Sequence, residues 1–312
     1  MRTWPMVILA LGVHLCANAW NLPLPDVAID DTNVYPESLS SAKNGTLYIG
    51  SLKGIVFRAN PGSAKAEPWI QPTPENGLLS VFGVLTDERT ETLWICSSPT
   101  MLPNPPTVGT AALMAFNLST GTQKGAYLFP APASLCNDIT IAPNGTAYAS
   151  DTLNGRILKL APRAKSLEIF AEDERLKGID GLVMSGDGKL YVNIVTRGLL
   201  LRVDIRRNGA AGEITQLTTS VPLAAPDGFR LIHGRTYLLA EGDGGRIDEV
   251  MIHRDHAQIR VLRDGLIAPP AVTVVGRTAY ALEGKINYLI NPRLKGQDPG
   301  PFIVHAVPLD RR

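Results

Sequence analysis

The sequence predicts an all-β fold, a six-bladed β-propeller with four antiparallel strands per blade. Three observations predict it. Gly (29) and Pro (24) are frequent among the 312 residues, tight-turn dipeptides separate short apolar runs, and one aromatic position recurs about every 45 residues. Repeats of this length that contain four short strands are typical of propeller blades. The recurring aromatic residues are Tyr48, Trp94, Tyr148, Tyr191, Tyr237 and Tyr280.

Each repeat has the same parts when aligned on its aromatic residue. A first strand meets a tight turn such as "KNG", "PNG" or "GDG", and a second strand such as "LYIG" or "LYVN" follows. A third strand led by Gly and a fourth strand complete the unit. A single blade cannot bury both of its faces, whereas a closed ring of blades can. We expect blades to start near residues 37, 82, 137, 180, 227 and 270, with 301–307 as the outer strand of the last blade.

The first 19 residues are typical of a secretory signal peptide, and we expect cleavage after Ala19. They combine a basic residue, the apolar run Met6–Cys16 and the sequence "ANA". The mature protein is therefore expected to be secreted or periplasmic. Residues 20–35 are expected at the ring closure, and residues 36–312 as the propeller domain.

Net charge and hydropathy exclude several classes of partner. The formal net charge is +1 with no basic or acidic block, so neither nucleic acid nor an anionic membrane surface is indicated. No later segment of the sequence is long and apolar enough to cross a membrane. We expect a monomer whose partner is a small molecule.

One polar position recurs at the start of the first strand. Counting back from the aromatic residue gives Glu37, Asn137, Asp180 and, after a shorter turn, Asp227. The innermost strands of a propeller line its central channel, so these four side chains should converge at one channel mouth. The equivalent positions in the other two blades are apolar, Phe82 and Pro270.

Three carboxylates at one channel mouth repel one another unless their pKa values rise or a cation neutralises them. An oxygen-only ligand set suits a hard divalent cation, most of all Ca²⁺, with Mg²⁺, Mn²⁺ and Zn²⁺ as alternatives. The competing interpretation is that Asp and Asn occur here because they suit turns. Recurrence in phase, with a Glu among the four, favours the metal site.

Five further residues are candidates for lesser roles. Asp151, Glu241 and Glu283 end second strands at the same mouth, where they could hold substrate or remain solvated loop acids. Cys96 and Cys136 lie at facing ends of neighbouring blades. A disulfide between them is geometrically feasible, although two buried thiols are the commoner outcome.

Several motifs resemble the regucalcin/gluconolactonase family of six-bladed propellers. They are "PESLS…NGTLYIG", "CNDITIAPNGTAYASDT", "DGLVMSGDGKLYV" and "PDGFRL". The resemblance implies a divalent cation, usually Ca²⁺, held by Glu37, Asn137, Asp180 and Asp227, with Asp227 as general base in sugar-lactone hydrolysis. "PESL" is also similar to the strictosidine-synthase-like and arylesterase propellers.

Two departures from the family pattern concern the substrate. Leu135 stands where the family has a sugar-binding Arg, and Asp180 stands where it usually has Asn. Both suit a neutral or apolar lactone or ester better than an acidic sugar lactone.

The predicted function is therefore metal-dependent hydrolysis of lactones or related esters. The alternative is a non-catalytic exported propeller that binds a ligand or protein. A third interpretation, a lyase or condensing enzyme, would need an acid or base near the last blade, where Glu283 is the candidate.

Overall fold

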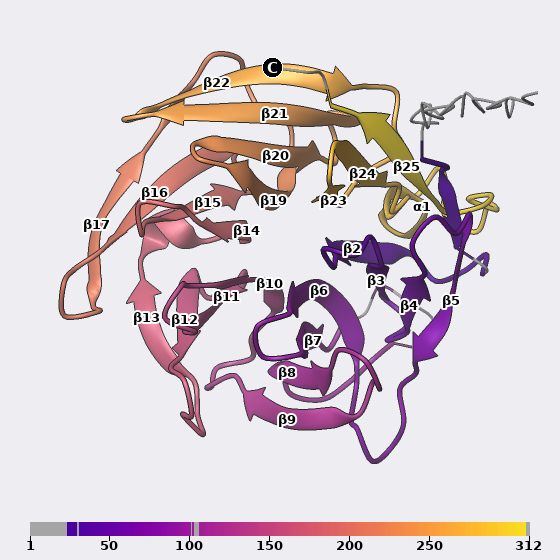
Figure 1. The fold of residues 1–312 in the computed structure, drawn as a ribbon, viewed down its shortest axis with the longest axis horizontal. Helices are drawn as coiled ribbons and strands as arrows, with labels where there is room; N and C mark the ends of the chain where they lie inside the picture. Colours follow the sequence, from indigo (N-terminus) through magenta and orange to yellow (C-terminus); the bar gives the residue numbers. More distant parts are fainter. Residues whose placement is uncertain (1–23, 30, 101, 103–105, 310–312) are drawn as a thin grey trace, which may run out of the picture.

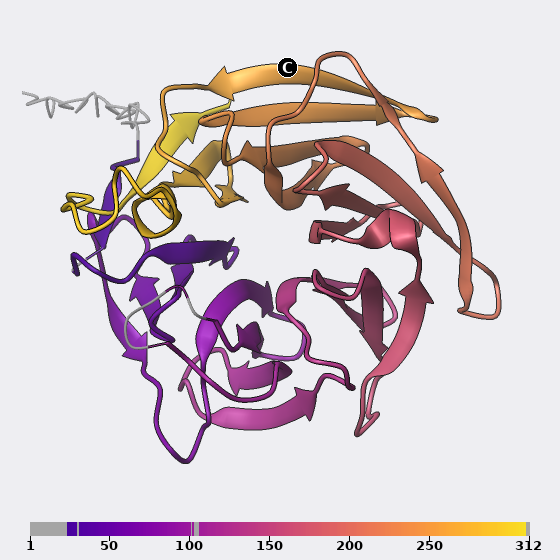
Figure 2. The ribbon, with the colours of Figure 1, turned by 180° about the vertical axis from the view of Figure 1, so that it is seen from behind.

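The computed structural model describes residues 24–29, 31–100, 102 and 106–309. The predicted signal peptide lies outside the described residues. The chain is all-β, and its strands surround a central axis as in a propeller (Figure 1; the same ring from behind in Figure 2). The described part of the chain contains two short helical turns, η1 (Glu174–Leu176) and α1 (Asn287–Ile290). Neither is long enough to span a bilayer.

Three sheets have four antiparallel strands each, arranged in chain order from the axis outward (Figure 1). One consists of β6 (Ser80–Asp87), β7 (Thr92–Ser98), β8 (Ala112–Asn117) and β9 (Gln123–Leu128). The next consists of β10 (Cys136–Ile141), β11 (Ala147–Asp151), β12 (Arg156–Leu160) and β13 (Glu168–Glu172). The third consists of β14 (Ile179–Met184), β15 (Leu190–Ile194), β16 (Leu199–Ile205) and β17 (Ala211–Gln216).

A fourth sheet contains five strands. Its antiparallel strands are β19 (Pro226–His233), β20 (Thr236–Glu241), β21 (Arg246–His253) and β22 (His256–Arg263). The short β18 (Thr218–Thr219) pairs in parallel with the outer edge of β22.

The remaining sheet has eight strands and joins the two ends of the chain. Its order is β2 (Pro36–Ser41), β3 (Leu47–Ser51), β4 (Val56–Ala59), β5 (Lys65–Ile70), β1 (Val27–Ile29), β25 (Ile303–Pro308), β24 (Thr278–Leu282) and β23 (Ala271–Val275). Strand β1 runs antiparallel to β25 and parallel to β5, so the N-terminal segment connects the first and last parts of the ring. The expectation that residues 301–307 form an outermost strand is wrong, because β1 covers β25.

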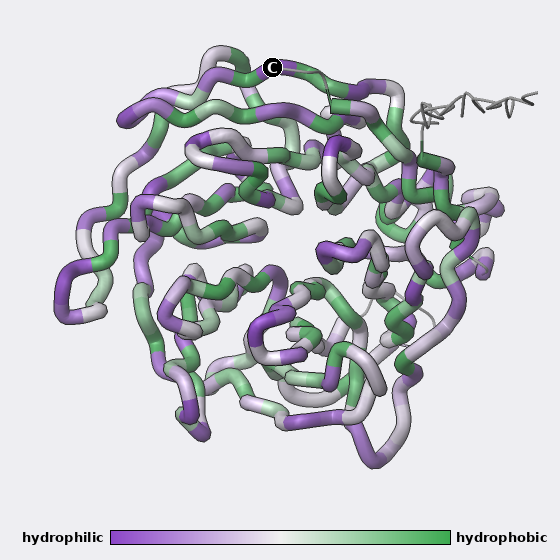
Figure 3. The backbone as a smooth tube through the Cα atoms, viewed as in Figure 1, coloured by the Kyte–Doolittle hydropathy of each residue, from purple (hydrophilic) through white to green (hydrophobic). Residues whose placement is uncertain are grey.

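Apolar side chains pack between neighbouring sheets rather than in one central core. Tyr48 of β3, for example, shares a buried cluster with Val81 and Val84 of β6. The recurring aromatic residues lie in these layers, and Tyr191 contacts Tyr237 of the next sheet edge-on. Hydrophilic residues concentrate at the peripheral turns (Figure 3). The axis is therefore left to the innermost strands, which contact one another in the cyclic order β2, β6, β10, β14, β19, β23 and back to β2.

Candidate functional site

Each predicted inward-facing position on the first five innermost strands lies in a break of strand register. The pairing of first and second strands shifts at these places, which is the mark of a β-bulge. A bulge turns one side chain away from the regular alternation of the strand. The predicted residues within these bulges are Glu37, Phe82, Asn137, Asp180 and Asp227, and three of the bulges also contain the next residue, which is Asp138, Gly181 or Gly228.

In three of the five bulges the inward-facing residue is followed by glycine, which close contact with the neighbouring bulge requires. A Cβ atom on Gly83 would overlap the Asn137 carbonyl oxygen, and one on Gly181 would overlap the Asp227 carbonyl oxygen. The backbones of adjacent sheets therefore touch at the level of the polar side chains. This contact brings the oxygen-bearing residues of neighbouring sheets together.

The structure brings the four predicted ligands into mutual interaction. Asp227 and Asn137 both lie close enough to the Asp180 carboxyl to lower its pKa. Glu37 interacts with Asp180 and Asp227 through charge. Asn137 also donates one hydrogen bond from Nδ2 to Thr152 Oγ1 at 3.1 Å.

Crowding raises the pKa values of all three carboxyls. Burial raises the pKa of Asp180 to about 7, and the charge of Asp138 adds to the rise. Asp227, Asn137 and Arg230 oppose it. Burial, then the charges of Asp180 and Glu37, holds the pKa of Asp227 well above its ordinary range. Burial and Asp180 do the same for the pKa of Glu37. Protons or another positive charge must therefore neutralise this mouth at neutral pH.

The acidic side chains of this mouth do not by themselves form a metal cage. Among the described residues, no group of three or more His, Cys, Asp or Glu side chains is arranged to hold a metal ion. A cation bound here would oppose the raised pKa values of Asp180 and Asp227.

Side chains on the second strands hold the bulges in place. Ser150 Oγ donates to the Asp180 carbonyl at 2.8 Å and accepts from the Asp138 N–H at 2.9 Å. Asn193 acts in the same way one sheet further on, donating to the Asp227 carbonyl and accepting from the Gly181 N–H. Both lie two residues after the recurring aromatic residue. Sequence reasoning missed them, although the repeat alignment places them in equivalent positions.

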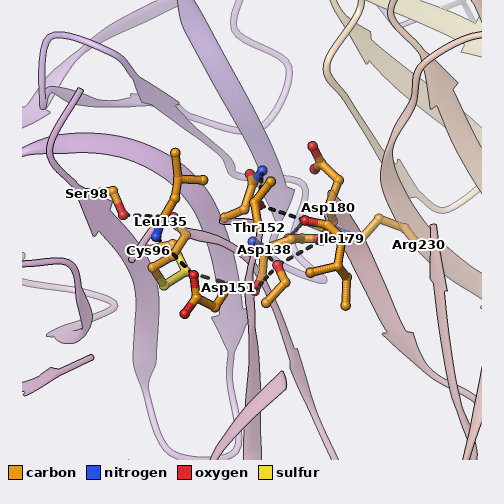
Figure 4. Close-up of a disulfide and its surroundings, with 12 residues drawn as sticks. Cys96, Ser98, Leu135, Asp138, Asp151, Thr152, Ile179, Asp180 and Arg230 are labelled. Atoms are coloured by element: carbon orange, nitrogen blue, oxygen red, sulfur yellow. Dashed lines mark hydrogen bonds and ion pairs between the residues drawn. A yellow bond between two sulfur atoms is a disulfide. The ribbon is translucent and has the colours of Figure 1, made fainter. Parts of the chain in front are cut away.

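Cys96 also lies two residues after the recurring aromatic residue, which is Trp94 in β7. It forms a disulfide with Cys136, the residue before Asn137. The pair is therefore bonded rather than two buried thiols. The disulfide lies among bonds that fix the start of β10, including Ser98 Oγ to the Cys136 carbonyl at 3.1 Å (Figure 4). It ties the strand that carries Asn137 to the neighbouring sheet.

Replacing both Cys96 and Cys136 by Ala is expected to lower the free energy of unfolding by roughly 4 kcal/mol. The two cysteines are 40 residues apart, and a closed loop of that length restricts the unfolded chain by this order. Denaturant titration of the oxidised protein and the double variant measures the difference. Equal midpoints would show that the disulfide contributes no stability.

An ion pair that sequence reasoning missed crosses the channel behind the acidic mouth. Arg230 donates from Nη1 to Asp138 Oδ2 at 2.6 Å and from Nη2 to Oδ1 at 2.8 Å. Both side chains are largely buried, and the Leu182 N–H also bonds Asp138 Oδ2 at 3.2 Å. The far side of Arg230 borders a cavity of about 390 Å³ whose lining includes Thr140 and Met184. The pair therefore lies between the acidic mouth and that cavity.

The three acids predicted to contact substrate are engaged inside the protein. Asp151, Glu241 and Glu283 accept the backbone N–H groups of Leu135, Ala224 and Ile267, respectively. Each also has a basic neighbour at the start of the following segment, which is Arg156 at 2.6 Å, Arg246 at 2.7 Å and Lys285 at 3.7 Å. In each case the acid therefore fixes the segment that leads into the first strand. The N–H group that it binds lies two or three residues before the inward-facing position of that strand.

Asp248 on β21 is a further buried acid with an altered pKa. Both of its carboxyl oxygens are buried without a hydrogen-bond partner, and Arg246 Nε lies 3.4 Å from Oδ2. Burial and the neighbouring Glu241 raise the pKa of Asp248 to about 8, with Arg246 opposing the shift. The folded state therefore binds this proton more tightly than the unfolded chain does.

Asp248→Asn is expected to stabilise the protein at pH 8 relative to the wild type. The folded pKa is raised, so the contribution of Asp248 is fully favourable only below its unfolded pKa and is lost as pH rises towards about 8. Asn keeps the shape of the protonated acid and does not titrate. Thermal melts at pH 5 and pH 8 should show a relative gain of about 1–3 kcal/mol for the variant at the higher pH. A gain that does not change with pH would contradict this assignment.

Solved structures with this fold carry several different activities. No family model matches the chain, and neither does any curated protein sequence. A gluconolactonase from Xanthomonas campestris matches with 15% identity and a TM-score of 0.63, over 92% of this chain and 99% of that one. A luciferin-regenerating enzyme matches with 12% identity and a TM-score of 0.67, over 89% and 92% of the two chains. A streptogramin B lyase matches with 16% identity and a TM-score of 0.58, over 92% and 87%.

The first two of these proteins correspond to the family that the sequence motifs resemble, and both are structural neighbours of this chain. At these identities the likeness shows the fold alone. The comparisons therefore establish an all-β propeller, and the chemistry has to be argued from the residues at the channel mouth.

Proposed function

We propose that this chain is a metal-dependent hydrolase of lactones or related esters. We interpret the eight-stranded sheet as two blades joined through β1, which with the four other sheets gives six blades. The observation that carries the proposal is the group of four oxygen-bearing side chains on neighbouring bulges, three of them carboxyls with raised pKa values. The gluconolactonase structure supports the choice of reaction.

The donor set fits a hard divalent cation, and Ca²⁺ is the first choice. Glu37, Asn137, Asp180 and Asp227 would hold it, and the raised pKa values indicate where positive charge is needed. A bound cation supplies polarisation of an ester carbonyl and stabilisation of the negative charge that develops in the transition state.

The protein groups then have separate tasks. Asp227 accepts a proton at a carboxylate oxygen from the attacking water, as a general base within hydrogen-bond reach can do. Thr152 holds Nδ2 of Asn137 at 3.1 Å, which fixes the plane of that amide. Ser150 and Asn193 fix the bulges of Asp180 and Asp227 through the backbone carbonyls. The buried Asp138–Arg230 pair lies between the site and the cavity at the far end of the channel.

We propose a secreted or periplasmic monomer whose signal peptide is removed near Ala19. The Cys96–Cys136 disulfide supports export, since disulfides persist in oxidising compartments. The partner is a small lactone or ester, with neither nucleic acid nor membrane binding.

The alternative is an exported propeller that binds a ligand or a protein without turnover. The geometry of the acids favours it, because no group of three or more His, Cys, Asp or Glu side chains in the described residues is arranged for metal. Under this alternative the raised pKa values would be satisfied by protons alone.

Adding Ca²⁺ to chelator-treated protein is expected to raise the melting temperature by roughly 5 °C at a hundredfold excess over the dissociation constant. Binding should release protons near pH 7, because a cation lowers the raised pKa values of Asp180 and Asp227. Calorimetry in two buffers of different ionisation enthalpy measures that release.

A panel of lactones and aryl esters, with and without chelator, then separates the two functions. Hydrolysis that stops with chelator and returns with Ca²⁺ supports the enzyme. A cation-dependent melting temperature without hydrolysis supports the binding protein, and no response to any divalent cation contradicts the proposed site.

A further inference from the structure

The acidic mouth is interrupted on one side by an apolar surface. In the cyclic order of innermost strands, β6 lies between β2 and β10, so Phe82 separates Glu37 from Asn137. Phe82 belongs to a buried cluster with Tyr35 and Phe302, and Leu135 packs against the same cluster while remaining partly exposed. We call Phe82 and Leu135 the apolar wall.

The backbone that carries the apolar wall lies against the proposed site. Gly83, the residue after Phe82, packs against the carbonyl group of Asn137 so closely that it has no room for a Cβ atom. Leu135 is two residues before Asn137, and its N–H bonds Asp151 Oδ1 at 3.2 Å. The backbone at both members of the wall is therefore fixed relative to Asn137.

Exposed apolar side chains also occur at the end of the ring that carries this mouth. Five of the large hydrophobic residues that are exposed in the described chain lie in connections at the end where the first strands begin. The others lie on the outer strands β9, β13, β21 and β22, or at Leu24 before β1. The five are Val108, Leu153, Val221, Ile267 and Ile290. Leu153 follows Thr152, which bonds Asn137, and is 58% exposed.

We propose that the substrate is a neutral lactone or ester with an alkyl chain, and that Phe82 and Leu135 bind the first carbons of that chain. This inference rests on the proposed function and names its substrate class. An anionic group placed against Phe82 and Leu135 would lose its hydration without gaining a partner. A sugar lactone would leave its hydroxyl groups against apolar carbon, where lost hydrogen bonds are costly. An alkyl chain loses water there and gains contact with both side chains.

The test uses γ-lactones that differ only in the length of the alkyl substituent, from γ-valerolactone to γ-nonalactone. We expect kcat/KM of the calcium-loaded protein to rise about two- to fourfold per methylene, since full burial of one methylene corresponds to about fourfold. Leu135→Asn should lower kcat/KM at least tenfold more for γ-nonalactone than for γ-butyrolactone.

A second variant guards against a folding defect in Leu135→Asn. Leu153→Ser should reduce kcat/KM for the long-chain lactones about twofold or more and leave γ-butyrolactone unchanged. Its matched control is Leu128→Ser, because Leu128 is 63% exposed but lies on the outer strand β9. Leu128→Ser should match the wild type for every chain length.

Binding of alkyl-substituted γ-lactams, which resist hydrolysis, gives a reading without turnover. Calorimetry should show affinities that increase with chain length and that Leu135→Asn reduces. The inference is overturned if turnover does not depend on chain length, or if lactam affinity does not. Either result leaves the proposed hydrolase intact. Hydrolysis of no lactone at any length contradicts the proposed hydrolase, while the lactam series still reports whether the apolar wall binds alkyl chains.

Discussion

Asp227→Asn is expected to lower kcat for lactone hydrolysis by a factor of about 10³ or more. General-base catalysis by a positioned side chain contributes on the order of 10²–10⁴ to the rate. Asn keeps an oxygen of the same reach, so the variant can still bind a cation, but it cannot accept the proton from water. Stopped assays at saturating Ca²⁺ measure the loss as a fall in kcat rather than a rise in KM.

The stability of Asp227→Asn separates this role from a structural one. The pKa of Asp227 is held well above its ordinary range by burial and by the charges of Asp180 and Glu37. Removing one charge from this mouth relieves repulsion, so the cation-free variant should melt at the same temperature as the wild type or higher. The control is Asp151→Asn, which weakens the pair with Arg156 and should lower stability while kcat changes little. Wild-type kcat in Asp227→Asn would refute the assignment of the base.

The blade pattern could be predicted from the sequence because it repeats. The tight turns and aromatic positions recur in phase, and the innermost strands begin within two residues of the expected starts, at Pro36, Ser80, Cys136, Ile179, Pro226 and Ala271. The N-terminal strand was harder to predict, since β1 pairs with residues at both ends of the chain and has no repeat to mark it.

The contacts that hold the site in place depend on geometry that the repeats do not contain. The bulges appear only when the strand pairs are examined, although glycine after Phe82, Asp180 and Asp227 was a usable signal. Asp138 stands where those strands have glycine, and its partner Arg230 is 92 residues away. No local pattern connects two residues at that separation, so the pair across the channel could not be found from the sequence.

Arg230→Met is expected to destabilise the protein by about 3–5 kcal/mol at pH 7. The substitution leaves the buried Asp138 carboxylate without its bidentate partner, and an uncompensated buried charge costs about this much. Arg230 also opposes the rise in the pKa of Asp180, so its loss increases the repulsion at the acidic mouth. Denaturant titration of cation-free protein measures the change.

Two further variants establish whether the effect belongs to the pair. Arg175→Met breaks a bidentate pair with Asp173 in which the Arg side chain is 56% exposed, and exposed pairs contribute about 1 kcal/mol or less. Asp138→Leu combined with Arg230→Met removes both buried charges and should recover most of the lost stability, because a well-packed apolar pair can replace a buried ion pair. If the double variant were as unstable as Arg230→Met, the cost would come from packing at Arg230, and the channel would be closed by the bulk of that side chain rather than by its charge.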